Sequence, residues 1–239
     1  MKLQFSDSNK PHALVAKAFV LSLLFIGPAL GTPGSDSTTY SLDKCIVTGE
    51  VLGEHGDVVV KTYNGREVRF CCKACIADFE KDKVSFMKKL DEAIVETQLP
   101  LYPLQTCIVS GEPLDGAMGA PVNHIIGNRL IRLCCSSCKQ DLAADPAQYI
   151  AKLDTAVTKT QLTSYPSKVC PITGQQLGAM GDPFNYVFAG RLVRFCCAGC
   201  IDAFNDNPTA AITSIYGAMP QTGQADMTFR NSSTEKAID

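Results

Sequence analysis

The chain has 239 residues, which suits one or two ordinary domains, and 46% of them are hydrophobic. Its formal net charge is −2, and this slightly acidic balance gives no electrostatic footprint of a nucleic-acid-binding protein. Only three histidines occur, which argues against a catalytic metal site built from imidazoles. All 12 cysteines follow residue 44, so the chemistry of the chain is expected in its later part.

Residues 1–31 have the features of a secretory signal peptide. Lys2, Lys10 and Lys17 precede a run of thirteen mostly apolar residues, Ala18–Leu30, and small residues follow it. A helix needs about 20 apolar residues to cross a bilayer, so this run is short for a membrane span. We expect cleavage after Gly31 and export to the periplasm or the cell exterior, with no membrane span in the mature chain. Retention as an uncleaved anchor is the alternative.

After a short predicted linker, residues 32–39, the cysteines repeat in three copies of one pattern. In each copy a single cysteine is followed, after 25 or 26 residues, by the cluster C-C-x2-C, and no cysteine is left over. Self-similarity at this spacing indicates tandem modules. The predicted modules are 40–98, 99–161 and 162–217, and a disordered tail is predicted for 218–239. The cysteines are Cys45, Cys71, Cys72 and Cys75; Cys107, Cys134, Cys135 and Cys138; Cys170, Cys196, Cys197 and Cys200.

Each module predicts the same elements in the same order. The first cysteine lies in a tight turn with a glycine four residues later, for example Gly49. Two extended runs around a short turn, such as "VVVKTY" and "REVRF" around Asn-Gly, then predict a β-hairpin. After the cysteine cluster the apolar period becomes helical, and Ile76, Phe79, Phe86 and Leu90 fall on one face. Pro146 and Pro208 mark a helix break or the start of a further turn of helix. The predicted fold class is therefore a small α+β module of knuckle, hairpin and helix, repeated three times.

Modules of this size usually need a covalent or metal staple, and a metal site fits the cysteine spacing best. Cys72 and Cys75 are three residues apart and Cys71 and Cys75 are four apart, so both pairs can share one helical face. A helix N-terminus favours the thiolate that a metal requires. The distant cysteine can return through the hairpin to complete the set. Four thiolates suit a tetrahedral soft-metal ion and three suit trigonal Cu(I), so all twelve cysteines are candidate ligands.

Two other interpretations remain open. Disulfides could staple the modules, although each module has only one cysteine remote from its cluster, such as Cys45, which makes a second bridge awkward. A bare C-x2-C after a strand also resembles a thiol–disulfide oxidoreductase motif, but no module has room for the βαβ scaffold of such enzymes. We expect a protein that is not an enzyme.

Two further sets of residues recur at fixed positions in the modules. His55, Met118 and Met180 share one place in glycine-containing loops, and imidazole and thioether are both copper-type ligands, so they are candidate auxiliary ligands or loop caps. Six arginines precede the clusters, where they offset thiolate charge or form ordinary ion pairs with residues such as Glu67. They are Arg66, Arg69, Arg129, Arg132, Arg191 and Arg194.

The segments "GREVRFCCKACIADF", "CPITGQQLG" and "RLVRFCCAGCIDAFNDNP" together resemble the YHS and TRASH-type heavy-metal-binding domains. The resemblance rests on the C-x3-C pairs, on the apolar residues Phe79, Leu142 and Phe204, and on the Asp-Pro or Asn-Pro that ends the later clusters. It implies a treble-clef-like fold and a role in metal trafficking, sensing or resistance, often with copper. Asp82-Lys83 and the extra cysteines Cys72, Cys135 and Cys197 depart from the pattern. We expect an exported protein that binds one Cu(I) or Zn(II) per module and works with a metal-delivery or membrane-transport partner.

Overall fold

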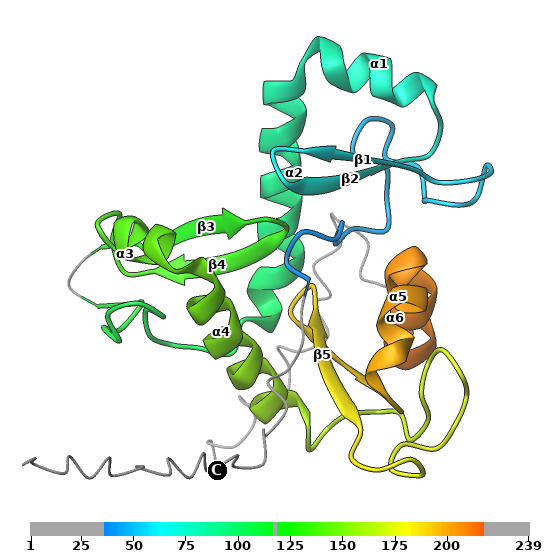
Figure 1. The fold of residues 1–239 in the computed structure, drawn as a ribbon. Coiled ribbons are helices and arrows are strands. Elements are labelled where there is room, and N and C mark those ends of the chain that lie inside the picture. Colours follow the sequence, from blue (N-terminus) through cyan, green and yellow to red (C-terminus); the bar gives the residue numbers. More distant parts are fainter. Residues whose placement is uncertain (1–35, 117–118, 218–239) are drawn as a thin grey trace, which may run out of the picture. The chain divides into compact units, whose positions relative to one another are not determined.

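Three antiparallel β-hairpins, each followed by two helices, form the part of the chain that the structure describes (Figure 1). The structure is a computed structural model and describes residues 36–116 and 119–217. These residues belong to one compact unit, Gly31–Asp239. The predicted signal peptide, the first half of the predicted linker, Met118 and the predicted tail lie outside the described residues.

The three modules share one order of elements. Module 1 contains β1 (Val59–Tyr63), β2 (Arg66–Phe70), α1 (Ala74–Lys81) and α2 (Lys83–Gln98). Module 2 contains β3 (Val122–Ile126), β4 (Arg129–Leu133), α3 (Cys138–Ala144) and α4 (Pro146–Gln161). Module 3 contains β5 (Phe184–Phe188), β6 (Arg191–Phe195), α5 (Ile201–Asp206) and α6 (Pro208–Tyr216). Short 3-10 turns lie at Leu99–Leu101 and Ala198–Cys200. The prediction of a small α+β protein in three similar units is confirmed.

Two-residue turns close the hairpins, as the sequence predicts. Asn64 and Gly65 both have positive φ, 51° and 74°, and this left-handed pair suits the twist of a tight hairpin. Ala189 and Gly190 do the same in module 3, whereas in module 2 the first turn residue, Gly127, has the positive φ of 60°. The turns fix the register, so that the residue before each cysteine cluster pairs with the first residue of the preceding strand; in module 1 this is Val59 opposite Phe70.

The helical segment of each module is two helices. The breaks predicted at Pro146 and Pro208 are found, whereas in module 1 the sequence suggested one continuous face. In module 1 the break falls at Asp82, whose carboxylate accepts the backbone N–H of Ser85 and so caps α2. Asp145 and Asn207 make the same cap in the other modules, and the prolines that follow them are the first residues of α4 and α6. The predicted apolar face is shared between the two helices: Phe79 on α1 stacks on Phe86 of α2 with ring centroids 5.7 Å apart.

Each module has its own apolar core, and two cores take in a residue from the next module. Phe70, Phe79 and Leu90 are fully buried in module 1, together with Leu130 from β4 of module 2. Val187 from β5 of module 3 is likewise buried in the core of module 2. The modules therefore depend on one another for part of their buried apolar surface.

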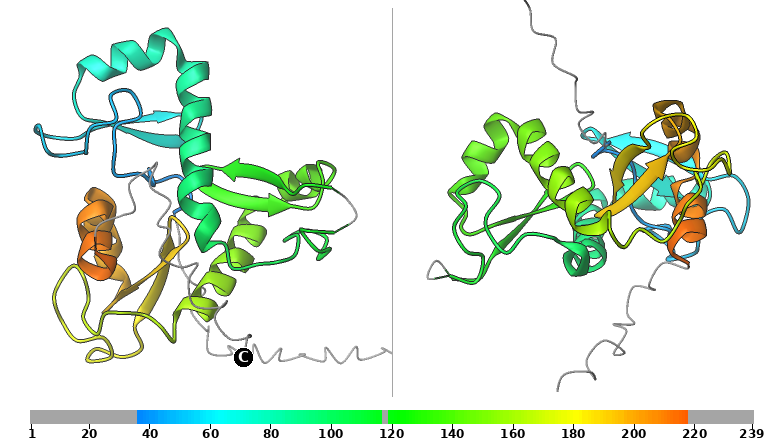
Figure 2. Two further views of the ribbon diagram at one scale, coloured as in Figure 1. Left: turned by 180° about the vertical axis from the view of Figure 1, so that it is seen from behind. Right: turned by 90° about the horizontal axis from the view of Figure 1, so that it is seen from below.

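Two glutamines hold the modules to one another in the same way. The side-chain amide of Gln98, at the end of α2, donates to the carbonyl of Asn128 (2.8 Å) and accepts the N–H of Leu130 (2.9 Å). Gln161, at the end of α4, makes the equivalent pair with Gly190 and Leu192, both at 2.8 Å. Each long helix is therefore hydrogen-bonded to the hairpin that follows it, and α2 lies beside β3 and β4 in Figure 1 and in the left view of Figure 2.

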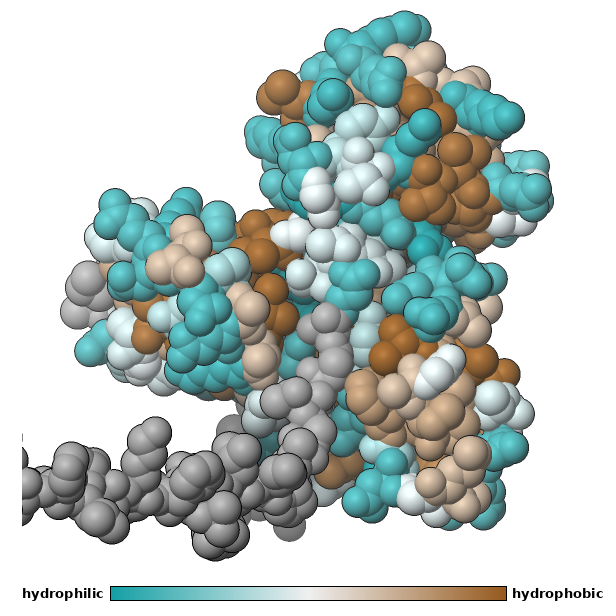
Figure 3. Space-filling view, viewed as in Figure 1, coloured by the Kyte–Doolittle hydropathy of each residue, from teal (hydrophilic) through white to brown (hydrophobic). Residues whose placement is uncertain are grey.

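Large apolar side chains are scattered on the surface of the described residues. Val84 is 82% exposed and Met180 is 64% exposed, and Figure 3 shows hydrophobic residues on this face in small separate patches among hydrophilic ones. None of the helices described has the length and apolar character that a membrane crossing requires.

Candidate metal centre

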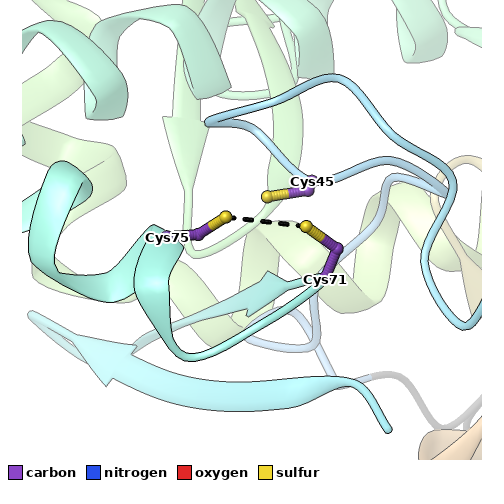
Figure 4. A group of neighbouring side chains, drawn as sticks. All are labelled: Cys45, Cys71 and Cys75. Carbon is purple, nitrogen blue, oxygen red and sulfur yellow. Dashed lines mark hydrogen bonds between the residues drawn. The ribbon is translucent and has the colours of Figure 1, made fainter. Parts of the chain in front are cut away.

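Three cysteine sulfurs converge in every module. The groups are Cys45, Cys71 and Cys75; Cys107, Cys134 and Cys138; Cys170, Cys196 and Cys200. Within each group all sulfurs lie within 4.8 Å of one another, and all nine side chains are buried. Figure 4 shows the module 1 group with its three sulfurs pointing toward one another from three different segments. These groups are positioned to bind a metal ion.

Local backbone structure places each of the three sulfurs. In module 1 Cys45 opens a tight turn in which its N–H donates to the carbonyl of Glu50 and its carbonyl accepts the N–H of Gly49, both at 2.8 Å. Gly49 has φ of 78°, a conformation that glycine adopts without strain. Cys71 directly follows β2, and Cys75 lies in the first turn of α1. The same turn recurs at Cys107 and Cys170, so one local design is built three times.

In modules 2 and 3 the distances from the third sulfur of the triad to the other two match those around a tetrahedral metal ion. Four sulfurs held about 2.3 Å from zinc at tetrahedral angles lie about 3.8 Å from one another. In module 2 Cys138 lies 3.8 Å from both Cys107 and Cys134. In module 3 Cys200 lies 3.8 Å from Cys170 and 3.7 Å from Cys196. A disulfide, by contrast, holds its sulfurs about 2.05 Å apart and satisfies two of them at a time.

The fourth cysteine of each module lies at the rim of its group and differs between modules. Cys72 is exposed, with its sulfur 3.5 Å from that of Cys75. Cys135 is partly buried and lies 3.9 Å from both Cys134 and Cys138, but it does not belong to the group whose sulfurs all lie within 4.8 Å of one another. Cys197 is exposed, and within the described residues no such sulfur contact joins it to its group. The prediction that these three residues are metal ligands stays a prediction.

A hydroxyl group touches the second sulfur of every triad. Thr48 Oγ1 lies 3.4 Å from Cys71 Sγ, Ser110 Oγ lies 3.4 Å from Cys134 Sγ, and Thr173 Oγ1 lies 3.5 Å from Cys196 Sγ. These residues follow the first cysteine by three positions, so the turn that presents the first sulfur also presents the hydroxyl. The sequence shows this Thr/Ser/Thr repeat, but its contact with a sulfur supplied by a distant strand end becomes visible only in the structure.

The turn also controls the protonation of the first sulfur. Burial acts to raise the pKa of the Cys107 thiol, but hydrogen bonds from the turn around Ser110 and from the backbone of Cys134 outweigh it and lower this pKa to about 6. Burial also acts to raise the pKa of the Cys170 thiol, but hydrogen bonds from the backbone of Cys196 and from the backbone of the turn around Thr173 outweigh it and lower this pKa to about 6. The first sulfur of these modules is therefore ready to ligate as a thiolate.

The third sulfur has the opposite tendency. Burial, followed by the neighbouring thiols of the same group, raises the pKa of Cys138 to about 12 and that of Cys200 to about 12. Burial raises the pKa of Cys75 as well. Three sulfurs packed together cannot all carry negative charge without a cation, and this is the electrostatic condition that a bound metal ion relieves.

The candidate auxiliary ligands that the structure describes, His55 and Met180, do not belong to the cysteine triads. His55 is exposed and belongs to none of the converging groups of metal-ligating side chains among the described residues. Met180 is exposed in its loop, and Met118 lies outside the described residues. Their proposed role as auxiliary ligands stays a prediction.

The six repeated arginines bind other partners than the sulfurs. Arg66 and Arg129 pair with carboxylates on the long helices, Asp91 at 2.7 Å and Asp154 at 2.6 Å. Arg191 has the corresponding place in module 3 and lies over the ring of Tyr216, 5.0 Å from its centroid. Arg69 pairs with Glu67, Arg132 lies over the ring of Tyr102, and Arg194 donates to Asn185. Of the two readings of these arginines, the structure therefore supports the ordinary packing and pairing role.

Comparison with known proteins identifies no relative. No protein-family model matches the chain, no curated protein matches it, and no solved structure matches it.

Proposed function

We propose that this chain is an exported protein that binds one soft metal ion, Cu(I) or Zn(II), in each of its three modules. The observation that carries the proposal is the convergence of three buried cysteine sulfurs, each from a different segment, in every module. Burying three thiols together gains little without a partner, whereas a soft cation is satisfied by three or four thiolates. The twelve cysteines are then the ligand set, with one remote cysteine and one cluster for each ion.

The resemblance to YHS and TRASH-type domains suggests the biological role of metal binding by this chain. A turn cysteine, a hairpin and a cluster at the start of a helix follow one another in all three modules, as a treble-clef-like domain requires. We propose that the protein acts in metal trafficking or resistance, outside the cytoplasm, with a delivery or membrane-transport partner. Three sites on one chain suit the retention or relay of ions, and we expect no catalytic turnover.

The alternative functions are less well supported by the fold. A thioredoxin-like oxidoreductase needs a βαβ scaffold, whereas each sheet in the described residues is a two-stranded antiparallel hairpin. A disulfide-stapled interaction protein would have to pair the third sulfur of each triad with the rim cysteine, such as Cys75 with Cys72, whose sulfurs lie 3.5 Å apart. It remains the competing proposal, because exported thiols without a metal tend to oxidise.

Metal and thiol analysis of the freshly purified full-length protein tests the proposal. We expect up to three equivalents of copper or zinc per chain and twelve titratable thiols after denaturation and chelation. Replacing the buried third ligand of each site in turn, Cys75→Ser, Cys138→Ser and Cys200→Ser, should remove one equivalent each time. Six disulfides with no bound metal would overturn the proposal in favour of the stapled alternative, and measurable thiol–disulfide turnover would favour the redox one.

A further inference from the structure

A residue with a β-hydroxyl lies beside the second sulfur of the triad in all three modules, although packing does not require a hydroxyl there. Thr48, Ser110 and Thr173 are all exposed, so no apolar core selects their size or shape. Each nevertheless keeps a β-hydroxyl, and each places it 3.4–3.5 Å from the second sulfur of its triad. An exposed position that conserves one functional group through three modules of the same chain points to the chemistry of that group.

In a site filled with metal, the hydroxyl proton can point in only one direction, toward the sulfur. In module 1 the backbone N–H of Glu50 donates to Thr48 Oγ1 at 3.3 Å. Glu112 donates to Ser110 Oγ at 3.3 Å and Gln175 donates to Thr173 Oγ1 at 3.4 Å. Since one lone pair of each oxygen is occupied in this way, and a metal-bound sulfur carries no proton, the hydroxyl is the donor to the sulfur.

The charge of a filled site explains why such a donor is needed. A divalent ion held by three thiolates has a net charge of −1, and four thiolates give −2. The repeated arginines are engaged elsewhere, and among the described residues none of their hydrogen bonds reaches a sulfur. Neutral dipoles therefore have to stabilise the negative charge, and the hydroxyl is the side-chain dipole that reaches the sulfur of Cys71, Cys134 or Cys196 in each module.

We propose that Thr48, Ser110 and Thr173 are positioning residues that tune the three metal sites, each donating a hydrogen bond to the thiolate of Cys71, Cys134 or Cys196. This inference rests on the proposed function and deepens it, because it assigns an affinity-setting group to each site. Loss of a hydrogen-bonding partner from the outer shell of a metal site typically lowers metal affinity by about 10- to 100-fold. Since these hydroxyls are exposed, we expect the lower end of that range. A thiolate that loses its donor also gives electron density to the metal more readily, so its charge-transfer band moves to lower energy.

Cd(II) titration of the reduced full-length protein tests the inference. The hydroxyl-free variant combines Thr48→Val, Ser110→Ala and Thr173→Val; the matched control exchanges one hydroxyl for the other, with Thr48→Ser, Ser110→Thr and Thr173→Ser. In competition with a chelator we expect the first to bind Cd(II) about 10-fold more weakly per site, with a red-shifted cadmium–thiolate band. The control should bind as the wild type does, with an unshifted band. A purely structural turn residue would lower stability without moving the band.

The outcomes separate this inference from the proposed function. If the wild-type protein fails to bind Cd(II), the proposed function fails and the inference with it. If the wild type binds three Cd(II) ions and the hydroxyl-free variant matches it in affinity and in band position, the inference alone is overturned. Should the triple variant unfold, Thr48→Val by itself decides the question, because it should leave two sites unchanged and weaken one.

Discussion

Arg129 and Asp154 form an ion pair of 2.6 Å in which both side chains are almost completely buried, at 3% and 1% exposure. The same guanidinium also donates to the carbonyl of Val187 in module 3. Module 1 repeats the pair as Arg66 and Asp91, but there the side chains are 14% and 43% exposed. The same arginine–aspartate ion pair is therefore buried in module 2 and partly exposed to solvent in module 1.

The two ion pairs should differ sharply in their effect on stability. Asp154→Ala leaves the Arg129 charge buried without a partner and should lower the free energy of unfolding by about 3–5 kcal/mol. Asp91→Ala breaks a partly solvated pair and should cost about 1 kcal/mol or less. Urea unfolding of both variants under identical metal loading measures the difference, and equal losses would contradict the prediction.

The glutamine that joins modules 1 and 2 should contribute through the backbone groups that it satisfies. Gln98→Met keeps the length of the side chain but leaves the carbonyl of Asn128 and the N–H of Leu130 without partners. Each unsatisfied buried group costs about 1–3 kcal/mol. Gln98→Glu retains an acceptor for Leu130 but places a buried carboxylate against the carbonyl of Asn128, so at neutral pH it should lose more. Thermal unfolding of the two variants checks the order of their stabilities. A Gln98→Met protein as stable as wild type would show that the hydrogen bonds of Gln98 to module 2 do not stabilise the fold.

The tight turns of the hairpins predict unequal effects of one substitution. Gly65→Ala places a Cβ in open space, so it should lower the free energy of unfolding only by the strain of a left-handed alanine, about 1–2 kcal/mol. Gly127→Ala introduces the same backbone strain, and its Cβ also clashes with the backbone carbonyl of Ser37. We expect Gly127→Ala to be the more destabilising by a margin that exceeds the backbone cost alone. Comparison of the two unfolding midpoints tests this, and similar midpoints would refute it.

Metal affinity should fall as the pH falls, with a slope that changes near pH 6 in modules 2 and 3. Above that pH the Cys138 and Cys200 thiols, with pKa about 12, must each release a proton on binding, whereas Cys107 and Cys170 are already thiolates. Below pH 6 Cys107 and Cys170 are protonated in the free protein, so metal binding releases one more proton per site. Cd(II) affinity measured from pH 5 to pH 8 should therefore decline more steeply below pH 6; a constant slope would contradict the assignment.

The sequence predicted local elements well because they depend on residues close together in the chain. Asn64 and Gly65 favour a left-handed two-residue turn, and the hairpin forms there. The cap at Asp82 was missed, because its neighbour Lys83 lacks the proline that marks the corresponding break at Pro146. Apolar spacing alone did not separate one helix from two helices that pack on the same core.

The candidate site was predicted less completely than the fold of each module. The repeat identified every cysteine that the structure brings together, since four thiols per module had no other evident use. Whether Cys135 and Cys197 lie equally near their triads could not be read from identical spacing, because side-chain direction depends on the backbone that connects strand to helix. In module 3 a 3-10 turn at Ala198–Cys200 replaces the helix start that module 2 has at Cys138.

The sequence by itself determined that there are three modules, which residues form their strands and turns, and which cysteines belong to each module. These properties follow from local propensity and from repetition along the chain. Only the tertiary structure decided that three sulfurs converge, that a hydroxyl from the knuckle touches a sulfur from the strand end, and that arginines bind helices and neighbouring modules. Such contacts join residues more than twenty positions apart, and their geometry is fixed by how the hairpin folds back against the turn and by how each long helix packs on the next hairpin.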